Sequence, residues 1–189
     1  MQALFYMDSR QLFGPRYVQL FCQSCPPKNR EKPLFDQIVH GVLNLRKQLD
    51  PLIEQFSSNW KISRMSCVDR NVIRMAVFEM LCCADIPAKV SINEAIDIGK
   101  KFGTEESGGF INGILDSIRR AIEEEKIDQA AFPTLPMGSQ GDAMALEQSP
   151  AHKDATAAAD TPKDAETIRV KRPVRLNPKV MKRPRSNSA

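Results

Sequence analysis

Apolar residues in the first 129 positions recur every three or four residues, which is the spacing of an amphipathic helix. No segment shows the sustained alternation between hairpin turns that is typical of strands. The expected fold class is therefore all-α. The apolar stripes predict helices over about residues 1–9, 15–25, 34–49, 51–60, 66–84, 91–102 and 110–123.

Local signals set the boundaries of these helices. Asp50 followed by Pro51 is typical of an N-cap before a proline at the first helical position, so we expect a new short helix to begin there. That helix would reach Trp60, which we interpret as a packing residue. Ser66, with Asp69 three residues later, is the expected cap of the next helix.

Further residues that mark helix ends lie between positions 91 and 110. Ser91 with Glu94 forms a capping box, and Gly103 is a suitable glycine at the end of the helix that follows. Residues 104–109 are expected to form a polar turn before a last helix that starts at Phe110. Free N–H groups at this helix start could hold a phosphate, whereas a simple inter-helix turn is the competing interpretation because two glutamates lie in it.

Charge and composition divide the chain. Lys and Arg balance Asp and Glu up to residue 129, so the net charge of +4 lies in the remainder. Apolar residues other than alanine are sparse there, and such a segment cannot bury enough surface to offset the entropy of ordering. We therefore expect one globular domain over residues 1–128 and a disordered low-complexity extension over 129–189, which ends in a flexible basic arm at 169–185.

The sequence has neither a run of roughly twenty apolar residues, as a membrane span requires, nor a secretory signal. We expect a cytoplasmic protein without a membrane partner. Five cysteines, an odd number, favour reduced thiols over a disulfide framework. Cys22 and Cys25 have the spacing of half a zinc site, but the globular part has no second such pair, so ordinary thiols are the preferred interpretation.

Groups suited to catalysis are scarce. Of the two histidines, His40 lies mid-helix and His152 lies in the tail, and the common nucleotide-binding and zinc-protease motifs are missing. We expect no enzyme activity, no catalytic residue, no metal and no cofactor. Glu79 lies beside the inner line of its helix, and the pattern leaves open whether it is a solvated side chain or pairs with a basic group of a neighbour or partner.

Three blocks, in this order, closely resemble the NusB family: residues 60–80 (WKISRMSCVDRNVIRMAVFEM), 86–103 (IPAKVSINEAIDIGKKFG) and 107–116 (SGGFINGILD). Residues 2–5 (QALF) also resemble the end of the family's first-helix motif, so the resemblance covers about residues 1–125. It implies a compact domain made of two packed three-helix bundles.

The resemblance also implies a function. NusB-like proteins bind the box A element of nascent RNA as a complex with NusE, a ribosomal protein of the small subunit. They help RNA polymerase to read through terminators, especially in ribosomal RNA operons. The expected partners are thus box A-type single-stranded RNA, NusE and the RNA polymerase antitermination complex; some proteins of this type pair with themselves, which leaves a homodimer open.

By this resemblance Glu79 is a candidate contact for NusE. Phe110 is the RNA residue we favour most, because single-stranded RNA is read partly by stacking of bases on aromatic rings; the alternative is that Phe110 belongs only to the core. The full set of residues implicated in RNA binding is Gln2, Phe5, Lys101, Glu106, Ser107, Phe110 and Asn112.

Two departures from the family pattern bear on RNA binding. Family members usually carry an arginine-rich segment before the first helix, whereas this chain begins at Met1 inside that motif, so either the start lies upstream or the basic arm is missing. Gly108 and Gly109 stand where a basic or polar side chain is common. Both changes would weaken RNA binding, because phosphate neutralisation supplies much of its free energy. Our hypothesis is that residues 169–185 act as a tethered RNA-binding arm instead; a merely solubilising extension is the alternative.

Two other functions stay open from the sequence. The helical RNA-binding domain of ribosomal RNA cytosine methyltransferases looks like NusB, but such enzymes need a cofactor-binding domain of alternating strands and helices, which the residues after 130 cannot form. The other alternative is a helical protein-interaction adaptor that has lost specific RNA binding.

Overall fold

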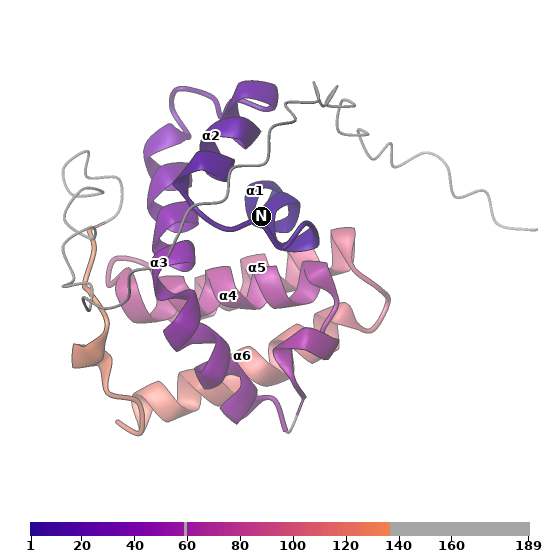
Figure 1. Cartoon of the computed structure of the whole chain (residues 1–189). Helices are drawn as coiled ribbons and strands as arrows, with labels where there is room; N and C mark the ends of the chain where they lie inside the picture. The colour runs from indigo at the N-terminus through magenta and orange to yellow at the C-terminus, as the bar shows by residue number, and fades with distance from the viewer. Residues whose placement is uncertain (59, 137–189) are drawn as a thin grey trace, which may run out of the picture. The chain divides into compact units, whose positions relative to one another are not determined.

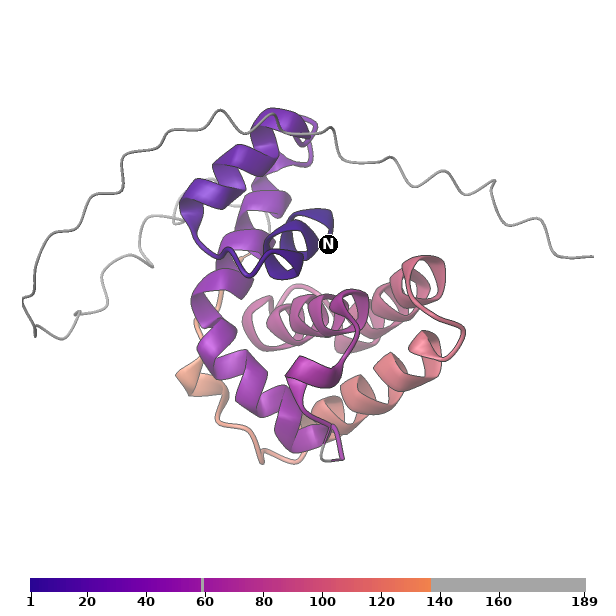
Figure 2. The same ribbon diagram turned by 45° about the vertical axis from the view of Figure 1, so that its right-hand side comes forward.

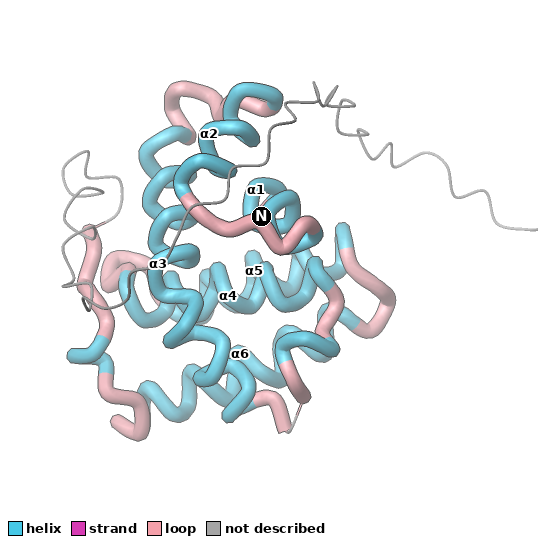
Figure 3. Tube along the Cα trace, viewed as in Figure 1, coloured by secondary structure: helices cyan, strands magenta, loops and turns pink. Residues whose placement is uncertain are grey.

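A computed structural model of the chain describes residues 1–58 and 60–136. Within these ranges there are six α-helices, two short 3-10 helices and no strand (Figure 3), which confirms the predicted all-α class. The elements are α1 (Gln2–Ser9), α2 (Pro15–Ser24), α3 (Lys32–Phe56), η1 (Ile62–Arg64), α4 (Cys67–Cys82), α5 (Ala88–Phe102), α6 (Ser107–Glu123) and η2 (Gln129–Ala131).

Helix α4 lies at the centre of the domain (Figure 1), where α1, α3, α5 and α6 all pack against it. Its side chains Val72, Ile73, Val77 and Phe78 are almost completely buried, and burial of each contributes roughly 1.5–3 kcal/mol. Helices α4, α5 and α6 contact one another pairwise and form a three-helix bundle. Helix α3 runs from the side of α2 to that of α6 (Figure 2).

Helix α3 is continuous from Lys32 to Phe56, so the prediction of a separate helix that begins at Asp50 is wrong. The Asp50 carboxylate caps nothing, because it accepts hydrogen bonds of 2.7 and 2.9 Å from Arg74 of α4. Pro51 lacks an N–H and removes one helical hydrogen bond. Leu49 and Ile53, completely buried on either side of it, hold the helix together by packing.

Helices α3 and α4 pack tightly at Gly41. A Cβ atom added to Gly41 would lie 2.2 Å from Cζ of Phe78, whose ring is completely buried. Any side chain at this position would have to displace that ring from the core. The glycine therefore allows the close packing of the two helices.

The starts of α4 and α5 test two predicted caps. Ser66 Oγ accepts a hydrogen bond of 3.0 Å from the Asp69 N–H, which confirms the first. The prediction of a capping box at Ser91 is wrong, because α5 begins three residues earlier, at Ala88. The Pro87 carbonyl already accepts the Ser91 N–H at 3.4 Å, so Ser91 lies buried inside the helix.

Helix α6 begins at Ser107, three residues before the predicted start at Phe110. The Ser107 side chain is buried, and its hydroxyl accepts a hydrogen bond of 2.8 Å from the Thr104 N–H. Gly103 ends α5 as predicted, although its φ of −97° is not left-handed. A Cβ at Gly103 would lie 2.3 Å from Ser107 Oγ, so this glycine lets the two helix ends meet.

The folded part continues past the boundary that we predicted at residue 128. The Leu135 N–H donates a 2.6 Å hydrogen bond to the Cys82 carbonyl, and Gln37 Nε2 donates one of 3.2 Å to the Pro136 carbonyl. Phe132 and Leu135 also pack against the core. Residues 129–136 therefore belong to the domain, whereas the rest of the expected extension, with the basic arm at 169–185, lies outside the described residues.

Candidate functional site

A buried carboxylate fixes α1 on α4. Asp8 is only 2% exposed, and its carboxylate accepts hydrogen bonds from Arg70 Nε and, at 2.7 Å, from Asn71 Nδ2. Burial alone would raise the pKa of this carboxyl. The hydrogen bonds from Arg70 and Asn71 and the charges of Arg74 and Arg70 outweigh burial, so the pKa lies below its ordinary value and Asp8 is ionised at neutral pH.

Arg74 extends this network to α3. Its side chain is 3% exposed, with Nη1 3.5 Å from the Asp8 carboxylate and both Nε and Nη2 bonded to Asp50. The same Nη1 donates to Asn71 Oδ1 at 3.1 Å. Three helices are thus joined by one buried guanidinium, whose removal would leave two carboxylates without their shared partner.

This network positions the exposed face of α1. Gln2 is exposed, and Phe5 is 38% exposed although it is apolar. On the inner side, Cys67 Sγ lies 3.4 Å from the Asp8 carboxylate and 3.9 Å from the Phe5 carbonyl. Burial and the Asp8 charge raise the pKa of the Cys67 thiol to about 11, so this thiol is protonated and poorly nucleophilic at neutral pH.

A second group of exposed side chains lies where α6 begins. Phe110 is half-buried, and its ring meets the Trp60 ring edge-on, with centroids 5.8 Å apart and planes at 68°. Trp60 itself is 51% exposed, so our interpretation of it as a packing residue is wrong in part: it contacts one ring and leaves half of its surface to solvent. The polar and charged residues on both sides of Trp60 are the sequence feature that indicates this exposure.

The α5–α6 junction presents three more of the residues implicated by the resemblance. Lys101, Glu106 and Asn112 are all exposed, and Lys101 Nζ lies 5.4 Å from the centre of the Phe102 ring. Ser107 differs from them because it is buried and its hydroxyl is engaged by the Thr104 N–H. In this arrangement Ser107 holds the turn and does not face solvent.

Gly108 allows a lysine to lie along the junction. A Cβ at Gly108 would be 3.0 Å from Cγ and 3.1 Å from Cε of Lys100. The aliphatic part of Lys100 therefore packs on the glycine, and its ammonium group is carried toward the start of α6. Phosphate binding at this helix start stays a prediction, with Lys100 and Lys101 in favour and the exposed Glu105 and Glu106 against.

Glu79 lies on the side of α4 that faces α5, near enough to the N-terminal amino group of Met1 for the two charges to interact. Burial raises the pKa of its carboxyl, the Ser91 hydroxyl acts in the opposite direction, and the charge of Glu94 raises the pKa again. A half-buried carboxylate beside a like charge is disfavoured in the free protein. The N-terminal ammonium group of Met1 offsets part of this cost.

The segment from Trp60 to Cys67 joins the two groups of exposed side chains. At one end the Trp60 ring contacts Phe110, and at the other Cys67 lies against the Phe5 carbonyl. Arg70, one turn into α4, binds both the Met65 carbonyl at 2.8 Å and the Asp8 carboxylate. The segment 60–67 therefore contacts both the α1 group, which includes Phe5, and the α6 group, which includes Phe110.

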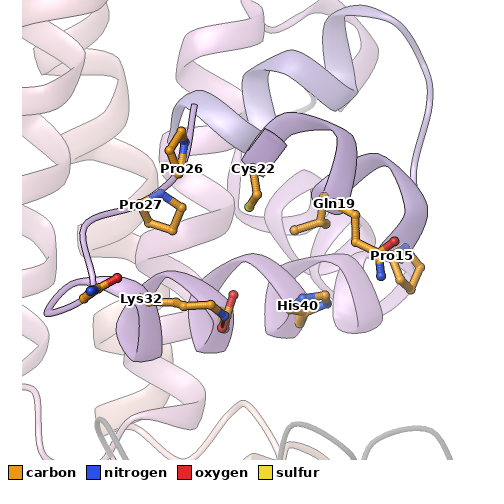
Figure 4. Close-up of a pocket in the computed structure, with 10 residues that line it drawn as sticks. Pro15, Gln19, Cys22, Pro26, Pro27, Lys32 and His40 are labelled. Atoms are coloured by element: carbon orange, nitrogen blue, oxygen red, sulfur yellow. Dashed lines mark hydrogen bonds and ion pairs between the residues drawn. The ribbon is translucent and has the colours of Figure 1, made fainter. Parts of the chain in front are cut away.

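A pocket lies elsewhere, between α2 and α3 (Figure 4). Cys22 and His40 line it together with Lys32 and Asp36, which form an ion pair. None of the side chains that the sequence implicates in RNA or partner binding is among its lining residues. The pocket is therefore separate from the candidate site.

The described residues offer no group of three or more His, Cys, Asp or Glu side chains arranged to hold a metal ion. All five cysteines are free thiols, in agreement with the sequence interpretation. Among helices of the described ranges, none has the length and apolarity needed to cross a membrane.

Known proteins resemble this chain in sequence. The model of the NusB family matches residues 1–120. The transcription antitermination protein NusB of Desulfatibacillum aliphaticivorans is 52% identical over 130 residues, which cover 68% of this chain and 91% of that protein. The protein of the same name from Desulforapulum autotrophicum is 50% identical over 121 residues, covering 63% and 85%.

Solved structures resemble it in fold. A structure of T. maritima NusB matches with a TM-score of 0.55 and 32% identity, over 67% of this chain and 91% of that one. A chain in the "Crystal Structure of a Plectonemic RNA Supercoil" matches with a TM-score of 0.57 over 64% and 88%, and at 24% identity this likeness concerns the fold alone. From the family match over residues 1–120 and the relatives that are identical to it at half or more of the aligned positions, this chain belongs to the NusB family of transcription antitermination proteins.

Proposed function

We propose that this chain binds box A RNA together with the ribosomal protein NusE, and that the complex helps RNA polymerase to read through terminators, notably in ribosomal RNA operons. Membership of the NusB family is the observation that carries the proposal. The exposed aromatic side chains of Phe5 and Trp60 support it, as do the two lysines in the last turn of α5.

Each exposed residue has a chemical role in this proposal. Phe110 and Phe5 offer ring faces or edges on which unstacked bases can pack. Lys101 supplies positive charge for a backbone phosphate. Gln2 and Asn112 can donate to and accept from base edges, whereas Glu106 can only accept, which selects for an amino group on the base.

Two further residues have roles other than direct contact with RNA. Ser107 positions the α5–α6 turn through its hydrogen bond from the Thr104 N–H. Glu79 is the proposed contact for NusE, because its half-buried carboxylate would be stabilised by a basic side chain of the partner.

A secondary proposal concerns the C-terminal segment as an additional RNA-binding arm. Residues 169–185 lie outside the described residues and carry only basic charges among their ionisable side chains. If they act as a tethered RNA-binding arm, deletion of 137–189 flattens the salt dependence of RNA affinity, because each lost phosphate contact reduces the number of counterions released. An unchanged slope would assign the arm no part in binding.

The test is a titration of the full chain, with and without NusE from the same organism, against labelled box A RNA and a scrambled RNA at fixed moderate salt. We expect preference for box A that strengthens with NusE. Phe110→Ala should weaken box A binding by about five- to a hundredfold if a base stacks on the ring. Leu20→Ala is the matched control, since Leu20 is 39% exposed on α2, a helix that carries none of the proposed RNA-binding residues.

Equal binding of both RNAs in the presence of NusE would contradict the proposal. Binding of NusE without any RNA preference would instead favour a helical adaptor that has lost specific RNA recognition. The same titration with Glu79→Gln separates these cases, because that substitution should reduce NusE capture and leave the affinity of the isolated chain for RNA unchanged.

A further inference from the structure

Trp60 is the only tryptophan of the chain. At 51% it is the most exposed of the large hydrophobic side chains in the described part of the structure. An indole normally contributes to stability by burying a large apolar area. Here half of that area faces solvent, while the other side of the ring meets Phe110 edge-on.

The backbone on both sides of Trp60 is anchored. The Trp60 N–H donates to the Ser57 carbonyl at 3.1 Å, and the buried Ser57 hydroxyl lies 2.6 Å from the Trp60 carbonyl. On the following side, the Glu54 carboxylate accepts the Ile62 N–H at 2.8 Å and Lys61 Nζ at 3.1 Å. The chain therefore holds the indole at the surface in a defined place, and a loose loop does not account for its exposure.

Positive charge accompanies the exposed ring. Lys61 follows Trp60 directly and is exposed, although its ammonium group pairs with Glu54, and Arg64 lies exposed at the end of η1. An aromatic face beside cationic side chains has the chemistry that binds single-stranded nucleic acid, because bases stack on the ring while the charges neutralise phosphates. No residue of this segment is among those that the sequence implicated in RNA binding.

We propose that Trp60 is a second base-stacking residue beside Phe110, so that the two rings take successive bases of one single-stranded RNA. This inference rests on the proposed function, from which it takes the RNA. The two ring planes stand at 68°, and a base that stacks on one ring cannot lie flat on the other. The pair therefore fits a strand whose neighbouring bases are unstacked and splayed apart.

Because Trp60 is the sole tryptophan of the chain, its indole fluorescence reports directly on whether a base stacks on it. The full chain is titrated with box A RNA while indole emission and the anisotropy of labelled RNA are recorded in parallel, alone and with NusE. The Trp60→Phe variant supplies the background from other fluorophores, including those of NusE. We expect indole quenching that saturates at the same RNA concentration as the anisotropy change, because a stacked base quenches the ring.

Variants give a second readout. Trp60→Ala should weaken box A binding by about five- to a hundredfold, whereas Trp60→Phe, which keeps a stacking face, should stay within about threefold of the unmodified chain. Circular dichroism at the assay temperature verifies that each variant is folded. Should Trp60→Ala not fold, the quenching experiment on the unmodified chain and the Trp60→Phe affinity still decide the matter.

Three outcomes would overturn the inference in distinguishable ways. RNA binding by anisotropy with unchanged indole emission and full affinity in Trp60→Ala would exclude Trp60 as a contact while the proposed function stands. A change in emission on addition of NusE alone, with loss of NusE capture in Trp60→Ala, would assign the ring to the protein interface. Equal binding of box A and scrambled RNA would remove the inference together with the proposed function.

Discussion

The two regions that present the candidate RNA-binding side chains are held in place by different forces. Helix α1, with Gln2 and Phe5, is fixed by ionised groups, since the Asp8 carboxylate is buried among two arginines and an asparagine. The α5–α6 junction, with Phe110 next to it, is held by a hydroxyl, a backbone N–H and two close-packed glycines. One half of the surface therefore depends on the ionisation of the protein, and the other does not.

The contrast has an energetic basis. A buried ion pair gains little net stability over apolar packing, because desolvation offsets the attraction, but loss of one partner leaves a charge that is costly to bury. A neutral hydrogen bond in a turn is worth about 1 kcal/mol, and its loss leaves no charge behind. The α1 region should therefore respond strongly to substitution and to acid, and the junction weakly to both.

The largest effect is expected for Arg74→Ala. This substitution leaves Asp8 and Asp50 without their shared partner in the interior and should lower the free energy of unfolding by about 3–5 kcal/mol. Urea unfolding at neutral pH measures it. Arg120→Ala is the control, because Arg120 forms an exposed ion pair with Asp116 and its loss should change little. Similar losses in both variants would contradict the proposed importance of the buried network.

Asp8→Asn should follow, with a loss of about 2 kcal/mol at neutral pH and a changed response to acid. The pKa of Asp8 is lowered in the folded protein from its ordinary value of 3.8, so the carboxylate stabilises the fold fully above that value. The stabilisation is lost as the pH falls through the lowered pKa. Urea midpoints between neutral and acidic pH should fall less steeply in Asp8→Asn than in the unmodified chain; parallel curves would refute this role of Asp8.

Ser107→Ala, at the α5–α6 junction, is expected to have a smaller effect on the free energy of unfolding. Loss of the acceptor for the Thr104 N–H should lower the free energy of unfolding by about 1 kcal/mol. Because no ionised group is involved, the dependence of stability on pH should keep the shape it has in the unmodified chain. Ser117→Ala serves as the control, since that hydroxyl is exposed on α6. A pH dependence that changes with Ser107→Ala would show that the junction too relies on charge.

The smallest change, of opposite sign, is expected for Glu79→Gln. Burial raises the pKa of Glu79 above its ordinary value of 4.5 in the folded protein, so the ionised carboxylate opposes folding at neutral pH. This penalty is relieved as the pH falls through the raised pKa. Glu79→Gln should therefore raise the thermal midpoint slightly at neutral pH, and a lowered midpoint would contradict this account of the carboxyl.

Local patterns predicted much of the fold but little of what holds the site. The apolar stripes and the Ser66 cap depend on residues a few positions apart, and the structure confirms them. The role of Asp50 could not be predicted in this way, because its partner Arg74 is 24 residues away and meets it only after α3 and α4 pack. A local cap and a tertiary ion pair compete for the same carboxylate, and the ion pair prevails.

The candidate site shows the same limit. The family resemblance points to Phe110 and Lys101, of which Lys101 is exposed and Phe110 is half-buried. Ser107 carries a polar side chain in the family motif, yet the structure buries it in the turn. The apolar pattern predicts Trp60 as a packing residue, whereas its backbone is held at the surface by the hydrogen bonds of the turn around Ser57 and Glu54, which no periodicity reveals.

The proposed support of antitermination by this chain, through box A RNA and NusE, can be measured by transcription in vitro. Templates that carry box A or its scrambled version ahead of a terminator are transcribed with RNA polymerase and NusE, with and without the full chain. The account predicts that the chain increases terminator read-through only on the box A template, and that Phe110→Ala loses most of this increase while Leu20→Ala retains it. Read-through that rises equally on both templates, or that Phe110→Ala leaves unchanged, would contradict the account.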